Sequence, residues 1–377
     1  MLKEFLNNKP LYYDEIDYTR MPRIYEKIKS FLPLAKIIHI IGTNGKGTTG
    51  RFLASALNCL GYNTGHYTSP HILKFNERIW LNGENISDEI LDKTHKKLQT
   101  ILSQEDSNSL SYFEYTTFLA MLIYEDCDYV VLEAGLGGER DATAVFPKEL
   151  TLVTPIDFDH EAFLGDTLEA IATTKLNAIQ KNAILANQKF DKVYEIAFNR
   201  DAKIYKVDEL LDSSDIEKNA IISKNLELRA YLQDNLKLSI SALRFLGINY
   251  ECSDFNNARL FGRLSKLNEN IYIDVGHNRL AAISVVEALS GKKYILVYNT
   301  YKDKNYKEIL EILSPIIERV EIIDVDDSRI ESKKLLQQTM DNLGIKHKVF
   351  KQITKDNQYF VFGSFSVAEI FLKVYYA

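Results

Sequence analysis

A glycine-rich turn that carries one lysine and several hydroxyls follows an apolar run near the start of the chain. The run spans residues 36–41, and the turn consists of Gly42, Thr43, Asn44, Gly45, Lys46, Gly47 and Thr48. Glycines allow a tight turn in which backbone N–H groups converge on an anion, while a lysine reaches terminal phosphates and a hydroxyl faces Mg²⁺. The segment therefore indicates a site for a nucleoside triphosphate.

The spacing within this turn differs from that of a standard phosphate loop. A standard loop has four residues between its first glycine and the Gly-Lys pair, and a Ser or Thr directly after the lysine. Here two residues separate Gly42 from Gly45, and Gly47 stands between Lys46 and Thr48. Taken alone, the segment also fits an ordinary strand-to-helix turn in a doubly wound domain.

Polar residues also follow two other strand-like runs in the first half of the chain. Glu133 ends the run 128–133, and Asp157, Asp159 and His160 follow the run 150–155. Because parallel strands present their carboxyl ends at one edge of a sheet, Glu133 is a candidate ligand of Mg²⁺. His160 is a candidate metal ligand or phosphate donor. The alternatives are a glutamate that ends its strand in solvent and a structural histidine.

Three other segments supply candidate groups. Residues 67–71 and 76–79 are dense in polar donors and are typical of a binding loop. In the second half, the run 271–275 contains Asp274 and is followed by His277. Arg263 precedes it and is suited either to a phosphate across a cleft or to an interdomain salt bridge.

The elements that must position these groups alternate between strands and helices. Strands are predicted at residues 36–41, 129–133, 150–155 and 183–186, and a second series at 271–275, 294–298, 320–325, 348–350 and 359–362. A helix is predicted over residues 226–245. This alternation predicts an α/β protein with a doubly wound, mostly parallel sheet and a second, smaller sheet of the same kind. A chain of 377 residues also exceeds the usual size of a single core, and we place the boundary near residue 258.

The composition restricts the class of partner. The formal net charge is −6, and no long basic run suggests binding to nucleic acid or to an anionic membrane. No apolar stretch approaches a membrane span or a signal peptide, so a cytoplasmic protein is expected. Cys59, Cys127 and Cys252 lack metal spacing, and we interpret them as reduced core residues.

Together these segments resemble the folylpolyglutamate synthase and dihydrofolate synthase family, a branch of the Mur ligase superfamily. The glycine after Lys46, which departs from the standard loop, is a feature of this family. The matches span nearly the whole chain, and they are residues 42–48, 68–71, 76–79, 112–114, 132–138, 159–160, 164–168, 262–263, 274, 276–278 and 363–364.

The resemblance implies an ATP-dependent ligase that joins L-glutamate to dihydropteroate, to a reduced folate, or to both. The acceptor carboxylate would attack the γ-phosphate of ATP, and the glutamate amine would then displace phosphate from the acyl phosphate. The protein's part in such chemistry is mainly positioning and charge neutralisation. The resemblance also implies a P-loop ATP-binding domain with the pterin site in residues 1–258, a Rossmann-like glutamate-ligase domain in residues 259–377, and a monomer.

Individual roles follow from the same resemblance. Residues 42–48 with Asn235, Arg263 and Asp274 would contact ATP, and Ser69, Glu133 and His160 would bind magnesium. Lys175 matches a lysine that the family often carbamylates, which creates a ligand for a second metal. Arg20 and His71 would lie at the acceptor, and His277 and Ser364 at glutamate. The candidate catalytic residues are Lys46, His160, Lys175, Asp274 and His277.

The chain departs from the family pattern in three places. After Gly138 the family usually has Arg-Leu-Asp-Ala-Thr-Asn, whereas residues 139–144 read Glu-Arg-Asp-Ala-Thr-Ala. Leu176 and Asn177 replace an Ala-Gly pair after Lys175. The segment 274–278 lacks the family's second-position glycine and the proline after the asparagine.

Two other functions remain as alternatives. A Mur-type ligase of peptidoglycan precursors would need an additional amino-terminal domain for its nucleotide-linked substrate, whereas the phosphate turn here starts at residue 42. A nucleotide-binding switch without ligase activity would not need Arg263, Asp274 and His277 beside the nucleotide.

Overall fold

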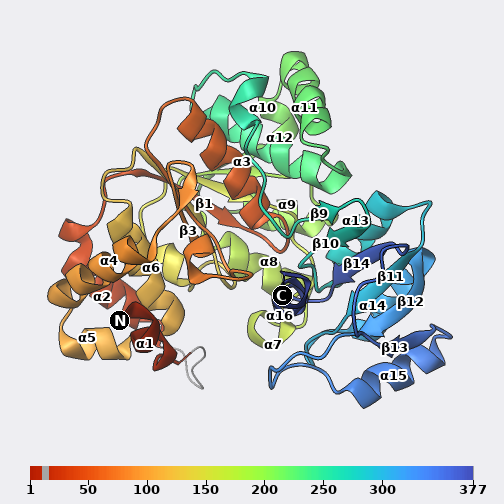
Figure 1. Cartoon of the computed structure of the whole chain (residues 1–377). Coiled ribbons are helices and arrows are strands. Elements are labelled where there is room, and N and C mark those ends of the chain that lie inside the picture. The colour runs from red at the N-terminus through yellow and green to blue at the C-terminus, as the bar shows by residue number, and fades with distance from the viewer. Residues whose placement is uncertain (11–16, 377) are drawn as a thin grey trace. The chain divides into compact units, whose positions relative to one another are not determined.

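The computed structural model describes residues 1–10 and 17–376. They form two compact units (Figure 1). Unit 1 comprises Met1–Leu228 with Leu232–Arg259, and unit 2 comprises Arg229–Tyr231 with the residues from Leu260 onward. The assignment of ATP and acceptor binding to the first domain and of glutamate binding to the second stays a prediction.

Unit 1 is built on a mostly parallel sheet. Its strand order, among the described residues, is β4-β3-β2-β5-β1-β6-β7-β8. Only the pairings of β3 with β2 and with β4 are antiparallel. The strands are β1 (Lys36–Ile41), β2 (Thr64–Tyr67), β3 (Ile79–Leu81), β4 (Glu84–Asn85), β5 (Tyr129–Glu133), β6 (Leu150–Val153), β7 (Asn182–Leu185) and β8 (Lys203–Lys206).

Helices cover both faces of this sheet. One core joins strand residues such as Ile37 and Val130 to α2, α4 and α6, and another joins Ile41 and Val153 to α8 and α9. Ser111 and Glu114 form a capping box that starts α6. The helices are α1 (Leu2–Asn7), α2 (Arg20–Ile28), α3 (Lys46–Cys59), α4 (Asp88–Ile101), α5 (Gln104–Ser109), α6 (Tyr112–Ile123), α7 (Glu161–Leu164), α8 (Leu168–Leu176), α9 (Asp191–Phe198), α10 (Val207–Leu210), α11 (Ser213–Asn225) and α12 (Ala230–Phe245), whose first two residues belong to unit 2.

The topology of unit 1 creates a binding edge beside β1. Strand β1 lies between β5 and β6, and its connection through α3 leads to β2 on the β5 side. The connection from β5 crosses instead to β6 on the other side of β1. In such sheets ligands bind where neighbouring connections diverge, at the carboxyl ends of the strands. The phosphate turn, Glu133 and the segment after β6 all follow strands that end at this edge.

Unit 2 is a smaller α/β unit. Its sheet, in the part of the chain that the structure describes, has the order β13-β12-β11-β14-β10-β9, with β9 antiparallel. Figure 1 shows helices around this sheet. The strands are β9 (Ser265–Asn268), β10 (Ile271–Ile273), β11 (Tyr294–Tyr298), β12 (Ile317–Ile322), β13 (His347–Val349) and β14 (Tyr359–Phe362), and the helices are α13 (Arg279–Leu289), α14 (Tyr306–Leu313), α15 (Lys333–Asn342) and α16 (Phe365–Tyr376).

The predicted fold class is confirmed, and the largest difference concerns one helix. Four predicted strands have the observed bounds, at residues 36–41, 129–133, 294–298 and 359–362. The helix predicted from residue 226 begins only at Ala230. Leu226 is the C-cap of α11, and Glu227 has a φ of 51°, a left-handed conformation that a helix cannot continue. The short strands β2, β3, β4, β8 and β9 were not predicted.

The interpretation of all three cysteines as core residues is wrong for Cys59. Cys127 is buried and Cys252 is half-buried, but Cys59 is exposed, and all three are free thiols. Cys59 is the last residue of α3, whose buried positions end before it. An apolar side chain at the end of a helix need not face the core.

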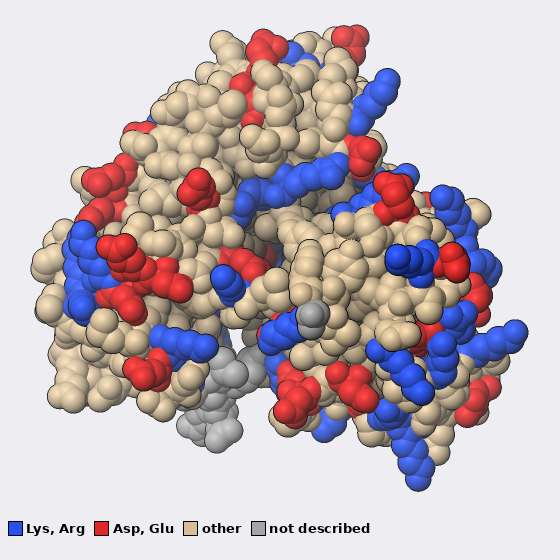
Figure 2. Space-filling view, viewed as in Figure 1, with Lys and Arg blue, Asp and Glu red and all other residues tan. Residues whose placement is uncertain are grey.

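The surface carries charges of both signs. On the face shown in Figure 2, Lys and Arg side chains lie among Asp and Glu side chains on each unit. No described helix is both long and apolar enough to span a bilayer.

Candidate active site

The phosphate turn connects β1 to α3 in a conformation that needs glycine. Gly42 has a φ of 134° and Gly45 a φ of 91°. A Cβ atom on Gly42 would overlap Thr154, and one on Gly45 would overlap the side-chain amide of Asn235. The turn therefore brings its backbone against two neighbouring elements and starts α3, whose N-terminal N–H groups and dipole favour an anion.

Two polar side chains of the turn are candidates for contact with a triphosphate. The Lys46 ammonium donates to the carbonyl oxygens of Gly42 and Thr43, each at 3.3 Å, and lies 4.0 Å from Glu133 Oε1. Among the described residues, the buried hydroxyl of Thr48 has no hydrogen-bond partner. Because buried polar groups are normally paired, this hydroxyl marks a position for a ligand atom.

Glu133 is a buried carboxylate at the end of β5. The residue is 4% exposed, and its Oε2 accepts hydrogen bonds from the Thr68 hydroxyl and, at 3.2 Å, from the Ser69 backbone N–H. The loop after β2 thus fixes Glu133 beside Lys46. Carboxylate and hydroxyl oxygens suit a hard cation such as Mg²⁺. Thr68 was not among the predicted site residues, although it stands beside Ser69 in the predicted binding loop.

The segment after β6 is attached to the phosphate turn. The Thr43 hydroxyl donates to the carbonyl oxygen of Asp157 at 3.0 Å, and the Asp157 N–H donates to that hydroxyl at 3.1 Å. His160 follows with a φ of 54°, and its Nε2 lies 3.9 Å from Asp159 Oδ2. Within residues 1–10 and 17–376, no three His, Cys, Asp or Glu side chains gather as a metal site. The metal set of Ser69, Glu133, His160 and Lys175 therefore stays a prediction.

Lys175 lies in the last turn of α8 and points at the phosphate turn. Its side chain is 3% exposed, and its ammonium donates to the carbonyl oxygen of Gly42 at 3.0 Å. Burial lowers the pKa of Lys175 to about 7, and the nearby charge of Lys46 contributes. In a substantial fraction of molecules the Lys175 amine is therefore uncharged near neutral pH, and a neutral amine is the form that reacts with CO₂.

We expect Lys175→Met to stabilise the protein at pH 7 and to do so less at higher pH. The unfolded chain keeps a proton on Lys175 up to about pH 10.5, whereas the folded chain releases it near pH 7. The free energy of unfolding of the parent protein therefore rises between these two pH values. The methionine variant lacks this pH-dependent contribution of Lys175. After discounting the lost hydrogen bond, the gain at pH 7 is on the order of 2 kcal/mol. Urea unfolding at pH 7 and pH 9.5 in bicarbonate-free buffer measures it, and a gain that grows with pH would contradict this account.

Two of the departures from the family pattern lie in contact with each other. The side-chain amide of Asn177 donates to Glu139 Oε2 at 2.8 Å, and an Arg200 Nη donates to Asn177 Oδ1 at 2.6 Å. Arg140 follows, and its guanidinium lies 4.3 Å from the ring centroid of Tyr18, a cation–π distance. The altered loop is thus held in part by Asn177, which is itself a departure from the family pattern.

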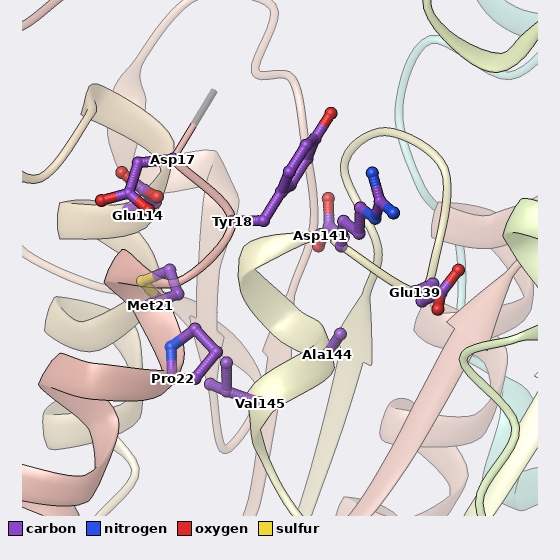
Figure 3. A pocket seen from close by; sticks show the side chains of 10 residues that line it. Asp17, Tyr18, Met21, Pro22, Glu114, Glu139, Asp141, Ala144 and Val145 are labelled. Atoms are coloured by element: carbon purple, nitrogen blue, oxygen red, sulfur yellow. The ribbon is translucent and has the colours of Figure 1, made fainter. Parts of the chain in front are cut away.

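A pocket of about 160 Å³ opens between α2, α6 and this loop. Figure 3 shows Asp17 and Glu114 on one side of it and Asp141 and Glu139 on the other. The Asp141 carboxylate accepts hydrogen bonds from the Leu136 and Thr143 N–H groups, each at 2.9 Å. Burial raises the pKa of Asp141, and these hydrogen bonds oppose the shift. The lining residues are Asp17, Tyr18, Met21, Pro22, Glu114, Glu139, Arg140, Asp141, Ala144 and Val145.

The two predicted acceptor residues are both engaged with neighbouring side chains. The Arg20 guanidinium donates to both carboxylate oxygens of Glu114, so it positions an acidic group of the pocket wall. His71 accepts a hydrogen bond from Arg78 Nε at 2.8 Å. Burial lowers the pKa of His71 to about 4, so its ring is neutral at physiological pH. Direct contact of either residue with an acceptor stays a prediction.

In unit 2, Asp274 is held at the end of β10. Its Oδ2 accepts hydrogen bonds from the Leu264 N–H at 2.8 Å and from the Tyr231 hydroxyl at 3.2 Å, and Oδ1 accepts one from the Gly276 N–H at 2.7 Å. Burial raises the pKa of Asp274, whereas the charge of Arg263 opposes that rise. Tyr231 was not predicted, because it precedes Asp274 by more than forty positions and no local pattern marks it.

The two residues predicted at glutamate lie near the ends of neighbouring strands of unit 2. His277 lies four residues beyond the end of β10, and its Nδ1 is 3.1 Å from the carbonyl oxygen of Val275. Ser364 is fully buried after β14, and its hydroxyl accepts the Val367 N–H at 3.1 Å as the cap of α16. Strands β10 and β14 are paired and parallel, so both residues belong to one sheet edge. Their contact with glutamate stays a prediction.

The fold and the phosphate turn define a P-loop nucleotide-binding protein built from two α/β units. No family model matches the chain. The crystal structure of Helicobacter pylori folylpolyglutamate synthetase is 37% identical to it, with a TM-score of 0.81 over 100% of this chain and 98% of that chain. The chain therefore belongs to the folylpolyglutamate synthase and dihydrofolate synthase family, and the resemblance seen in the sequence is confirmed.

Two further comparisons give a relative by sequence and a solved structure with the same fold. The dihydrofolate synthase/folylpolyglutamate synthase of Haemophilus influenzae is 28% identical over 96% of this chain and 94% of that protein. A bifunctional folylpolyglutamate synthase/dihydrofolate synthase with Mn, AMPPNP and L-glutamate bound shares the fold, with a TM-score of 0.82, 23% identity and coverage of 99% and 97% of the two chains.

Proposed function

We propose that this protein is an ATP-dependent ligase that joins L-glutamate to dihydropteroate, to a reduced folate, or to both, and releases ADP and phosphate. The observation that carries the proposal is the phosphate turn with Lys46 and the buried Glu133 beside it. Family membership and the relative that holds Mn, AMPPNP and L-glutamate support the choice of substrates.

The proposed reaction replaces a poor leaving group, oxide, by a good one, phosphate. A carboxylate is a poor acyl donor, because its leaving group would be oxide. Its attack on the γ-phosphate of ATP forms an acyl phosphate and releases ADP. The glutamate amine then attacks the acyl carbon, and phosphate leaves as the amide forms and the amine proton passes to solvent or to a base.

Unit 1 supplies the groups that this first step requires. Lys46 and the N-terminus of α3 would neutralise the charge that develops on the phosphates. Glu133, Ser69 and the Thr48 hydroxyl would hold Mg²⁺, which when bound supplies further charge neutralisation at the phosphate oxygens. The neutral fraction of Lys175 supports the proposal that this lysine takes up CO₂ to become a carbamate.

The pocket lined by Asp141 is the proposed site for the ring of the acceptor. A carboxylate accepts hydrogen bonds from ring and amino N–H groups, and Tyr18, Met21 and Val145 offer apolar surface to a flat ring. In unit 2, we assign Asp274 and Arg263 to ATP, and His277 and Ser364 to glutamate. Small molecules are the only proposed partners, and we propose a monomer that acts in the cytoplasm.

An assay of phosphate release with each acceptor in turn tests this function. The full-length protein, ATP and Mg²⁺ are incubated with L-glutamate plus dihydropteroate or tetrahydrofolate, and N-acetylglutamate, whose amine is blocked, serves as the matched control. Release should need the acceptor and a free amine together. If no phosphate is released with either acceptor, a nucleotide-binding switch would be favoured. If phosphate is released only with a nucleotide-linked muramyl peptide, a Mur-type ligase would be favoured.

A further inference from the structure

A chain of three hydrogen-bonded side chains leads from the core of unit 1 to the Asp141 pocket. It starts at His39, a fully buried residue of β1, whose Nε2 lies 2.8 Å from Thr143 Oγ1. The Thr143 hydroxyl donates to Asp141 Oδ1 at 2.5 Å. His39 and Asp141 are thus connected across about one hundred residues of sequence.

The hydrogen-bonding capacity of these groups fixes the direction of the chain. An ionised carboxylate only accepts hydrogen bonds, so the Thr143 hydroxyl must donate its one hydrogen to Asp141. The Thr143 oxygen then accepts from His39, which places the ring hydrogen on Nε2. His39 Nδ1 then carries no hydrogen; it is buried and has no partner among the described residues.

Burial favours the neutral form at both ends of the chain, whereas the hydrogen bonds to Asp141 favour its ionised form. Burial holds the pKa of His39 well below its usual value, and the charge of Lys148 adds to this effect, so the ring stays neutral. The ammonium of Lys148 donates to the carbonyl oxygen of Ala144 at 3.0 Å. Burial lowers the pKa of Lys148, and the charge of Asp141 opposes this shift. A buried cation near Asp141 favours the ionised carboxylate.

The hydroxyl of Thr143 does more than complete a local turn. The backbone N–H groups of Leu136 and Thr143 already hold one carboxylate oxygen each. The hydroxyl adds a third donor, and His39 polarises that hydroxyl from behind. The carboxylate plane is then fixed by three donors, so its remaining acceptor directions have a defined orientation toward the pocket that Asp141 lines.

We propose that His39 and Thr143 are positioning residues that orient the Asp141 carboxylate for recognition of the acceptor's N–H groups. This inference rests on the proposed function, because the pocket is taken as the acceptor site. Neither residue touches the acceptor, and the effect of each passes through Asp141. Precise orientation of a binding group by its neighbours commonly determines affinity.

Thr143→Val is the first test, because it removes the hydroxyl and keeps the shape. The KM for the acceptor should rise about tenfold, since a hydrogen bond to a charged group is lost. The KM values for ATP and glutamate and the kcat should change less than twofold. Thr143→Ser keeps the hydroxyl and should restore the acceptor KM.

Thr151→Val is the matched control. Thr151 lies on β6 as the register neighbour of His39, is fully buried, and its hydroxyl has no partner among the described residues. The same substitution there should leave every KM unchanged. A rise in the acceptor KM equal to that of Thr143→Val would show a general effect of core substitution and would overturn the proposal.

The double variant His39→Leu with Thr143→Val separates positioning from stability. Removing both partners leaves no buried donor unpaired, so its midpoint of urea unfolding should recover toward that of the parent. Its acceptor KM should stay as high as in Thr143→Val, because Asp141 still lacks the hydroxyl. Recovery of both quantities together would mean a merely structural role and would overturn the inference.

A parent protein that uses neither acceptor would overturn the proposed function, and this inference with it. An active parent with an unchanged acceptor KM in Thr143→Val would overturn this inference alone.

Discussion

Lys46→Ala should reduce glutamate-dependent ADP release by about three orders of magnitude or more. The Lys46 ammonium lies at the first position of α3, between the carbonyl groups of the turn and Glu133. It is the side-chain cation that the turn itself provides to the phosphates. Its loss removes that positive charge from the site where charge develops on the transferred phosphoryl group, and the backbone N–H groups of the turn replace it only in part.

The fold should survive this substitution. A lysine at a helix N-terminus faces the positive end of the helix dipole, so its removal costs little stability or even adds a few tenths of a kcal/mol. The midpoint of urea unfolding should therefore stay within error. Lys36→Ala at the start of β1, where the side chain is exposed, is the matched control and should keep full activity. Retained turnover in Lys46→Ala would refute the assignment of the turn to ATP.

Glu133→Gln should lower kcat by about 100-fold and raise the Mg²⁺ concentration needed for half-maximal activity. The amide keeps the size of the side chain, and its oxygen still accepts from the Thr68 hydroxyl and the Ser69 N–H. What is lost is the negative charge, which a neutral amide oxygen replaces poorly at a divalent cation. The measurement is the phosphate-release rate as Mg²⁺ is varied.

The control for this variant is Glu149→Gln. Glu149 precedes β6, is exposed, and lies at the amino ends of the parallel strands, away from the phosphate turn. It should keep the parent's rate and Mg²⁺ dependence. If Glu133→Gln behaved in the same way, Glu133 would have only a structural role in the loop after β2.

Local patterns were sufficient for much of the fold and for the phosphate site. The strands at residues 129–133 and 359–362 are short, wholly buried runs, so their composition alone marks them. Gly42 and Gly45 could be recognised because their conformations exclude other residues. The start of the helix predicted from residue 226 was wrong, because α11 packs through few buried positions and its end depends on the single left-handed residue Glu227.

By itself the sequence determined the α/β class, the family and the phosphate turn, because these depend on neighbouring residues and on the conformations that glycine alone adopts easily. Only the tertiary structure decided the partners of each site residue. Thr68 on Glu133, Asn177 on Glu139, and His39 behind Thr143 and Asp141 are contacts between distant segments. Such contacts depend on strand order and register, which place side chains within hydrogen-bonding distance and which no local pattern encodes.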